Sequence, residues 1–303
     1  MNGIIIVNKE KGWTSFDVVA KLRGILREKR IGHGGTLDPM AQGVLPVFIG
    51  KSAKACDILP DDRKGYIAGF QLGVTTDTLD CTGKILSEKP SNVNLNTLIK
   101  ATTSFLGETM QIPPMYSAVK IGGKKLYELA RSGQTVERQP RKIVVDSVEI
   151  TEFDEKNQSG VIEIMCRKGT YVRSIIDDIG EILGCGAMMT ALVRTLSSGF
   201  NINNAFTLNE IQRAVEKNEL DKIFIPIDKA FMVYDKITLK EYETKLYKNG
   251  VKLYPNQVYL DEEKNYQGKI FRIYGFDNEF LGIGHLDESE EDEKLFRSLK
   301  NFY

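Results

Sequence analysis

The chain has 303 residues, 42% hydrophobic and 27% charged, which is the composition of an ordinary globular protein with room for one large and one small domain. Its 41 basic and 41 acidic residues cancel, so the bulk charge is not that of a nucleic-acid binder, and no apolar run is long enough to span a bilayer. Four cysteines without a paired spacing and only two histidines exclude a histidine-rich metal site. We therefore expect a cytoplasmic protein with buried free thiols.

The N-terminal part alternates short apolar runs with turns. In chain order, we expect a strand at 4–7, a helix from about 15 to 29, a glycine-rich loop at 31–43, an edge strand or short buried segment at 44–49 and a strand at 64–74. Ser15 can cap the helix, and its inward face would be Phe16, Val19, Leu22 and Leu26. Alternation in the last strand places four side chains on one face: Tyr66, Ala68, Phe70 and Leu72.

The remainder of the chain predicts more strands than long helices. We expect a turn-rich loop at 75–83, helices at 92–106, from about 171, at 207–217 and at 240–248, paired strands at 141–153 and 160–166, and further strands at 192–195, 199–202 and within 250–286. Strands and helices do not alternate regularly. This favours an α+β fold with a mixed, largely antiparallel sheet flanked by helices. A connector at 221–236 divides a large domain, 1–235, from a small β-rich domain, 240–303.

The loop at 32–39, GHGGTLDP, is the densest candidate site. Its three glycines let the backbone approach a ligand closely. Asp38 precedes Pro39, which keeps the aspartate backbone out of the helical region. A carboxylate fixed in a loop suits nucleophilic or acid–base catalysis, whereas an Asp-Pro pair on its own more often forms a turn. The loop by itself favours the turn.

Two other classes of enzyme fit the sequence poorly. Residues 45–52 end in the GKS of a phosphate-binding loop, but Leu45 stands where that motif requires glycine. A serine hydrolase would need a G-x-S-x-G elbow, and the sequence has none. A nucleoside triphosphatase and a serine hydrolase are therefore both disfavoured.

Charge is unevenly distributed along the chain. Residues 287–293 hold six carboxylates, which we interpret as a solvated surface. Residues 120–142 carry two carboxylates and seven cations: Lys120, Lys124, Lys125, Arg131, Arg138, Arg141 and Lys142. This basic segment also contains Tyr127 and flexible glycines. It is either another solvated surface or a surface that neutralises RNA phosphates.

Six segments resemble, in order, the motifs of the TruB-type tRNA pseudouridine synthases. Residues 32–54 resemble the family's catalytic motif, with the sequence GHGGTLDPMAQGVLPVFIGKSAK. The others are VNKEKGWTSFDVV (7–19), KGYIAGFQLGVTTDTLDCTG (64–83), QIPPMYSAVKIGGKKLYELARSG (111–133), CRKGTYVRSIIDDIGEILGCGA (166–187) and LVRTLSSGF (192–200). The resemblance spans about residues 3–235. Residues 240–303 are similar, more loosely, to the small PUA-like domain of bacterial members.

The resemblance implies a role for each of several residues. Asp38 would be the nucleophile that starts the exchange of the glycosidic bond, by attack on either the ribose or the base. Tyr66 would stack on the flipped uracil, and Leu192 would form a wall of its pocket. Arg173 would pair with Asp38 and orient it. Ordinary alternatives exist: Tyr66 and Leu192 as core residues, and Arg173 in a surface pair with Asp177.

Further residues would contact the RNA. His33 would hold the base out of the stack, which is required before the base can react, and Lys9 would support the active site. The alternatives are a histidine bonded within its own turn and a solvated lysine. The basic segment would close as a clamp over the tRNA T-arm, through Lys120, Arg131, Arg141 and Lys142.

The family implies an enzyme that converts the T-loop uridine at tRNA position 55, without metal, organic cofactor or obligate protein partner, and we expect a monomer by default. Four departures from its motifs affect details of RNA contact: Glu10, Gln42, Met188 and Val193. Two alternatives are kept. One is a guide-RNA-dependent synthase of the dyskerin branch, which would need partners. The other is a tRNA-folding RNA chaperone, which would survive the change Asp38→Asn.

Overall fold

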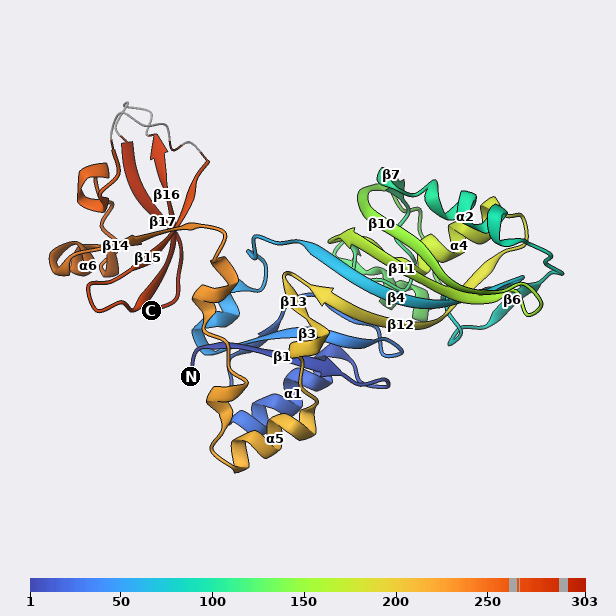
Figure 1. Ribbon diagram of the computed structural model, residues 1–303, viewed down its shortest axis with the longest axis horizontal. Helices are drawn as coiled ribbons and strands as arrows, with labels where there is room; N and C mark the ends of the chain where they lie inside the picture. Colours follow the sequence, from blue (N-terminus) through green and yellow to red (C-terminus); the bar gives the residue numbers. More distant parts are fainter. Residues whose placement is uncertain (262–265, 267, 289–293) are drawn as a thin grey trace.

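The computed structural model describes residues 1–261, 266, 268–288 and 294–303. A long sheet carries helices along its length, and a smaller sheet near the C-terminus stands beyond one end of it (Figure 1). The α+β fold predicted from the sequence is confirmed, and so is the small β-rich unit near the C-terminus.

Within these residues, the large sheet has nine strands. Their order is β1-β3-β12-β4-β11-β10-β7, with β2 paired to β3 and β13 to β12. Every pair is antiparallel except β3 with β12, which is parallel. The strands are β1 (Gly3–Lys9), β2 (Ile31–His33), β3 (Gln42–Ile49), β4 (Arg63–Leu72), β7 (Gly107–Gln111), β10 (Arg141–Asp154), β11 (Ser159–Arg167), β12 (Ala187–Ser197) and β13 (Phe200–Asn201).

Two pairs of helices cover different parts of this sheet (Figure 1). Helices α1 (Ser15–Leu26) and α5 (Leu208–Glu216) pack against β1 and β3. Helices α2 (Leu95–Thr103) and α4 (Val172–Ile182) pack against β4, β10, β11 and β12. Smaller elements are α3 (Leu126–Arg131), the hairpin of β5 (Val74–Thr76) and β6 (Ile85–Glu88), the hairpin of β8 (Lys120–Ile121) and β9 (Lys124–Lys125), and 3-10 turns at Gly50–Ala55, Ile202–Asn204, Leu220–Lys222, Ile227–Phe231 and Pro255–Val258.

Strands β1 and β3 are buried on both faces, which explains their continuous apolar sequences. Ile5 of β1 packs in the cluster with α1 and α5, whereas Ile4 packs on the other face with Phe231 and Phe302. Pro46 lies inside β3, opposite Ile6 of β1. The edge-strand interpretation of 44–49 is therefore wrong, and the buried segment is right.

Helix α1 begins differently from the prediction. Thr14, not Ser15, is the N-cap, and its side chain and that of Asp17 form a reciprocal capping box. Phe16 is 67% exposed, so it does not belong to the inward face. Ser15 is buried in its place, which turns its hydroxyl toward the loop that contains Asp38. In β4, by contrast, all four side chains predicted to share a face are buried.

The C-terminal unit has a four-stranded sheet among the described residues. It consists of β14 (Asp235–Thr238), β15 (Ile270–Tyr274), β16 (Phe280–Glu288) and β17 (Lys294–Asn301), and α6 (Glu241–Lys248) lies in the same unit. Its first strand begins at Asp235, earlier than expected. Ile283 and Phe302 pack in one cluster with Phe48 of β3, so the unit contacts the large sheet. Of the acidic run at 287–293, residues 289–293 lie outside the described residues.

Candidate active site

The loop that carries Asp38 is the tip of a hairpin between β2 and β3. It is fixed from both sides. The Leu37 N–H donates to Ser15 Oγ at 2.9 Å, and the Gly12 N–H donates to the Pro39 carbonyl at 2.8 Å. The Asp38 carbonyl accepts from the Ala41 N–H at 3.0 Å, which closes a turn with proline at its second position. The turn therefore exists, and it leaves the carboxylate free for other partners.

Asp38 and Arg173 meet at this loop. Arg173 lies in the first turn of α4, and its Nη2 is 3.2 Å from Asp38 Oδ2. The arginine side chain is 6% exposed and the aspartate 35% exposed, so the carboxylate retains an open side. Arg173 Nη2 also donates to the Tyr116 carbonyl at 2.6 Å. Because the arginine is buried and directed toward the loop, the surface pair with Asp177 is wrong.

Asp80 is a second partner of Arg173, and the sequence did not single it out. Its Oδ2 lies 3.7 Å from Arg173 Nη1. Its Oδ1 accepts from the Thr78 hydroxyl at 2.9 Å, and from the Thr82 N–H at 2.9 Å and hydroxyl at 2.5 Å. These bonds fix the carboxylate within the β5–β6 loop. The feature of the sequence that could have identified Asp80 is a carboxylate between threonines in a turn-rich segment.

The charges around Asp38 oppose one another. Burial raises the pKa of its carboxyl above the usual value, and the cation of Arg173 lowers that pKa. The carboxylate of Asp80 raises it as well, whereas the cation of Lys9 lowers it. The net direction is upward. A carboxylate with a raised pKa is a stronger base and nucleophile than an exposed aspartate.

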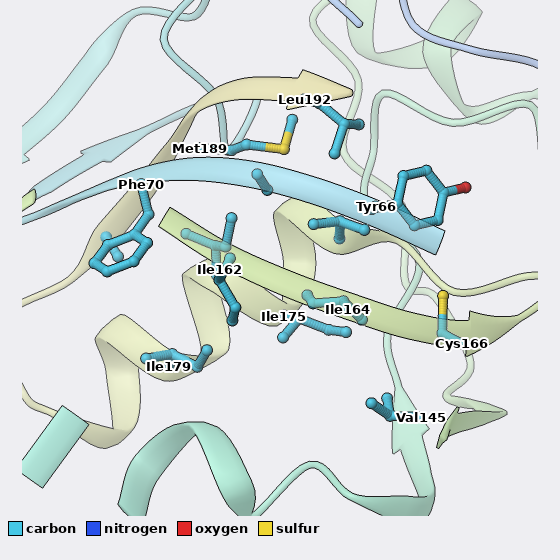
Figure 2. Close-up of a cluster of buried hydrophobic side chains, with 14 of the residues drawn as sticks. Tyr66, Phe70, Val145, Ile162, Ile164, Cys166, Ile175, Ile179, Met189 and Leu192 are labelled. Carbon is cyan, nitrogen blue, oxygen red and sulfur yellow. The ribbon is translucent and has the colours of Figure 1, made fainter. Parts of the chain in front are cut away.

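Tyr66 and Leu192 lie in the core cluster beside this loop. They are 6% and 8% exposed, and Leu37 and Met40 of the loop belong to the same cluster. Figure 2 shows the Tyr66 hydroxyl directed away from Ile162, with Leu192 on the neighbouring strand. Burial raises the pKa of the Tyr66 hydroxyl. The two side chains are thus part of the core and also border the loop.

Lys9 and His33 flank the loop from β1 and β2. Lys9 is fully buried, and its Nζ donates to the carbonyls of Trp13 at 2.6 Å, Glu10 at 3.1 Å and Pro39 at 3.5 Å. Burial lowers its pKa to about 8, opposed by Asp38. The solvated-lysine interpretation is therefore wrong. His33 is half-buried, and among the described residues its Nδ1 has no hydrogen-bond partner.

Arg194 is the largest fully buried side chain of the described residues, and the sequence analysis did not identify it. It lies on β12, with its Cα paired to Gly43 of β3 and to Tyr66 of β4. Its Nε donates to the Val44 carbonyl at 2.7 Å and its Nη2 to the Gly35 carbonyl at 3.0 Å. The available signal was a charged residue inside an apolar strand.

Tyr116, which lies just before the basic segment, contacts the site: its carbonyl accepts a hydrogen bond from Arg173. The four cations predicted to contact RNA are exposed or half-exposed: Lys120, Arg131, Arg141 and Lys142. Lys142 Nζ lies 2.7 Å from Glu108 Oε1, and the Arg131 guanidinium lies 5.4 Å from the centre of the Tyr127 ring. These side chains therefore lie on the surface and apart from the buried group around Asp38.

Comparison with known proteins decides the family. Residues 23–172 match the N-terminal domain of the TruB family pseudouridylate synthases, and residues 173–232 match the C-terminal domain of tRNA pseudouridylate synthase B. The chain belongs to the TruB family. Two relatives bear the name tRNA pseudouridine synthase B. That of Clostridium novyi (strain NT) is 44% identical over 94% of this chain and 95% of its own, and that of Alkaliphilus oremlandii (strain OhILAs) is 46% identical over 75% of each.

Solved structures resemble this TruB-family chain over nearly its whole length. A Cbf5-Nop10-Gar1 complex contains a chain that is 26% identical, with a TM-score of 0.75 over 99% of this chain and 85% of the other. An H/ACA RNP bound to a substrate RNA containing 2'-deoxyuridine has a chain at 24% identity and a TM-score of 0.73, over the same shares. The similarity to the H/ACA RNP chain shows a common fold and nothing more.

In the part of this TruB-family chain that the structure describes, no group of three histidine, cysteine or carboxylate side chains could hold a metal ion. No helix in the same residues is long and apolar enough to cross a membrane. All four cysteines are free, and Cys81 is exposed and Cys56 half-buried, which corrects the expectation that every thiol is buried.

Proposed function

We propose that the protein converts the T-loop uridine of tRNA, at position 55, to pseudouridine, with Asp38 as the catalytic carboxylate. The observation that carries this proposal is the 3.2 Å pair between Asp38 and Arg173, in a loop packed against Tyr66 and Leu192. A carboxylate held by a buried arginine, with one side open, is suited to attack on a substrate. The relatives named tRNA pseudouridine synthase B support the choice of tRNA as substrate.

The reaction begins with extrusion of the target base, because a stacked uridine is out of reach of any side chain. Tyr66 then stacks on the uracil, Leu192 forms the pocket wall and His33 holds the base out of the loop. Asp38 initiates cleavage of the N1–C1′ bond, and any bond that its carboxylate forms with the substrate breaks again before the product leaves. The uracil turns, a C5–C1′ bond forms, and the proton on C5 leaves for N1 through solvent. Atoms balance within the substrate, so no second substrate takes part.

The surrounding elements have supporting roles in this proposal. Lys9 anchors the loop through the carbonyls of Trp13 and Pro39. The basic segment 120–142 closes over the T-arm and binds phosphates, through its exposed cations. The protein acts as a monomer with a catalytic domain at 1–235 and a PUA-like domain at 240–303. It needs no guide RNA, because this basic segment supplies the RNA contact.

Pseudouridine formation on unmodified tRNA tests the proposal. Wild type should form about one pseudouridine per tRNA, and Asp38→Asn should form none above background while still binding tRNA. Asp177→Asn is the matched control, since Asp177 lies on the same helix as Arg173, whose ion pairs are instead with Asp38 and Asp80. It should retain activity. A wild type without activity, or an active Asp38→Asn protein, would refute the proposal. Activity confined to tRNA refolding would identify a chaperone.

A further inference from the structure

We infer that Arg194 is a positioning residue for this reaction: it fixes the loop that carries Asp38 relative to Tyr66 and provides a permanent positive charge beneath both. The inference rests on the proposed function. It concerns a side chain that does not touch the substrate and acts through its neighbours.

Three strands meet at Arg194. Its Cα pairs with Gly43 at the start of β3, directly after the loop, and with Tyr66 on β4. The approach to β3 is so close that a Cβ on Gly43 would lie 2.2 Å from the Arg194 carbonyl oxygen, and Gly43 has φ +101°. Only glycine meets both conditions without strain. Arg194 thus joins the catalytic loop to the strand of Tyr66.

The guanidinium holds the loop itself. It donates to the carbonyls of Val44 at 2.7 Å, Gly35 at 3.0 Å and Thr36 at 3.5 Å. These carbonyls lie on both sides of Asp38, so the arginine fixes the two arms of the hairpin tip together. A hydrocarbon side chain would leave these acceptors unpaired, which is costly in a buried position.

The charge of Arg194 is not neutralised locally. Within the described part of the chain, it forms no ion pair with a carboxylate. Burying such a charge without a carboxylate partner costs free energy. A buried and unpaired cation at a reaction site indicates a functional role.

Neighbouring groups respond to this charge. Burial, together with the charge of Arg194, lowers the pKa of Lys64 to about 8. Arg194 also opposes the burial that raises the pKa of Tyr66. The groups that face Lys64 are Arg194 on β12, Cys166 on β11, Asp62 before β4 and Lys168 after β11. Those that face Tyr66 are Arg194, Cys166 and Asp38.

Two substitutions separate the hydrogen bonds from the charge. Arg194→Lys keeps the charge and removes the guanidinium that donates to three carbonyls, whereas Arg194→Gln removes the charge. Arg167→Lys and Arg167→Gln are the matched controls, because Arg167 lies on the same sheet, is only half-buried and pairs with Asp62 and Asp146. Thermal melts identify the variants that fold.

The first readout is single-turnover pseudouridine formation at saturating T-arm RNA, with the Kd measured separately. A misplaced loop should lower the rate by about 10²-fold in both Arg194 variants, and the Kd should stay within about threefold. A folded Arg194→Lys protein with the wild-type rate would overturn the inference, whether or not Arg194→Gln folds.

The second readout needs no RNA, so it stands even if the proposed function fails. The ¹³Cε signal of Lys64, assigned with Lys64→Gln, should titrate near pH 8 in wild type and in Arg194→Lys. In Arg194→Gln its midpoint should move up by about one pH unit, because a like charge no longer disfavours the ammonium. If Arg194 had a merely structural role, its replacement would leave the titration midpoint of Lys64 unchanged. An unmoved midpoint in folded Arg194→Gln contradicts the electrostatic part of the inference.

Discussion

Asp80 Oδ2 lies 3.7 Å from Arg173 Nη1, and the two side chains are 4% and 6% exposed. The opposite nitrogen of the same guanidinium, Nη2, faces Asp38. Asp80 therefore fixes Arg173 on the side of the guanidinium opposite Asp38. Hydrogen bonds from Thr78 and Thr82 fix Asp80 itself. The orientation of Asp38 depends on a residue that has no contact with the open side of the site.

Asp80→Asn should therefore impair catalysis without impairing binding. The amide removes the charge that holds Arg173, so we expect kcat to fall about 10- to 100-fold, with KM within about threefold. Asp77→Asn is the control: Asp77 lies in the same loop and accepts from the Lys84 N–H, which an asparagine oxygen can replace. The effects of Asp80→Asn and Arg173→Lys should be strongly non-additive in the double variant. Additive losses would show that the two residues act separately.

Under the proposed function, the acid limb of the pH–rate profile reports on Asp38. Its carboxylate must be ionised to act, and burial raises its pKa above the usual value of 3.8. Activity on T-arm RNA, measured as kcat/KM, should therefore decline at a pH above that of an ordinary aspartate. Because Arg173→Lys weakens the ion pair with Asp38, the midpoint of that variant should move to still higher pH. A midpoint at or below 3.8 in wild type would contradict the burial argument.

Asp38 should also lower stability at neutral pH. Because its pKa is higher in the folded state than in the unfolded state, ionised Asp38 destabilises the fold, and this cost disappears as pH falls through the folded-state pKa to below 3.8. The Tm of Asp38→Asn should exceed that of wild type at about pH 7, and the difference should shrink as the pH is lowered. A variant less stable than wild type at neutral pH would show that the Arg173 pair outweighs burial.

The clamp should be visible in salt dependence. Neutralising Arg131, Arg138, Arg141 and Lys142 with glutamine should weaken tRNA binding and reduce the slope of log K against log salt, by about 0.7 to 0.9 for each phosphate that the variant no longer neutralises. Lys142 should contribute least, since it already pairs with Glu108. Lys217→Gln and Lys222→Gln together form the control, beyond the end of α5. An unchanged slope in the fourfold variant would remove the clamp hypothesis.

Gly43 provides a test of the junction between β3 and β12. Gly43→Ala places a Cβ 2.2 Å from the Arg194 carbonyl, in addition to the strain of φ +101°. Gly107→Ala carries a similar backbone strain, with φ +86°, but has no atom within 4 Å of its Cβ. The free energy of unfolding should fall by at least about 1 kcal/mol more for Gly43→Ala than for Gly107→Ala. Equal losses in the free energy of unfolding, measured by urea titration, would mean that β3 and β12 separate easily.

Local patterns determined how much of this structure was predictable. Alternation in β4 correctly placed Tyr66 on the buried face. At the start of α1, Thr14 and Ser15 are both capping residue types, and the sequence does not distinguish them. The tertiary contact of Ser15 with Leu37 decides which one turns inward.

The site was predictable only where a motif named the residue. Arg194 and its acceptor Val44 are 150 residues apart, and Asp80 in the β5–β6 loop meets Arg173 in the first turn of α4. No periodicity in the chain encodes such contacts, because they form when strands distant in sequence become neighbours in the sheet. Lys9 shows the same effect in reverse: an ordinary lysine in sequence becomes a fully buried anchor of the loop.

Residues 112–140, which include most of the basic segment, connect Gln111 of β7 to Arg141 of β10. These two residues are Cα partners across the two strands. A segment whose ends are already joined by the sheet can change in length or sequence at little cost in loop-closure entropy. Under the proposed function, evolution can therefore alter which RNA is bound by replacing residues 112–140, while the hairpin with Asp38 stays as it is. Substrate choice and bond chemistry can diverge independently in this architecture.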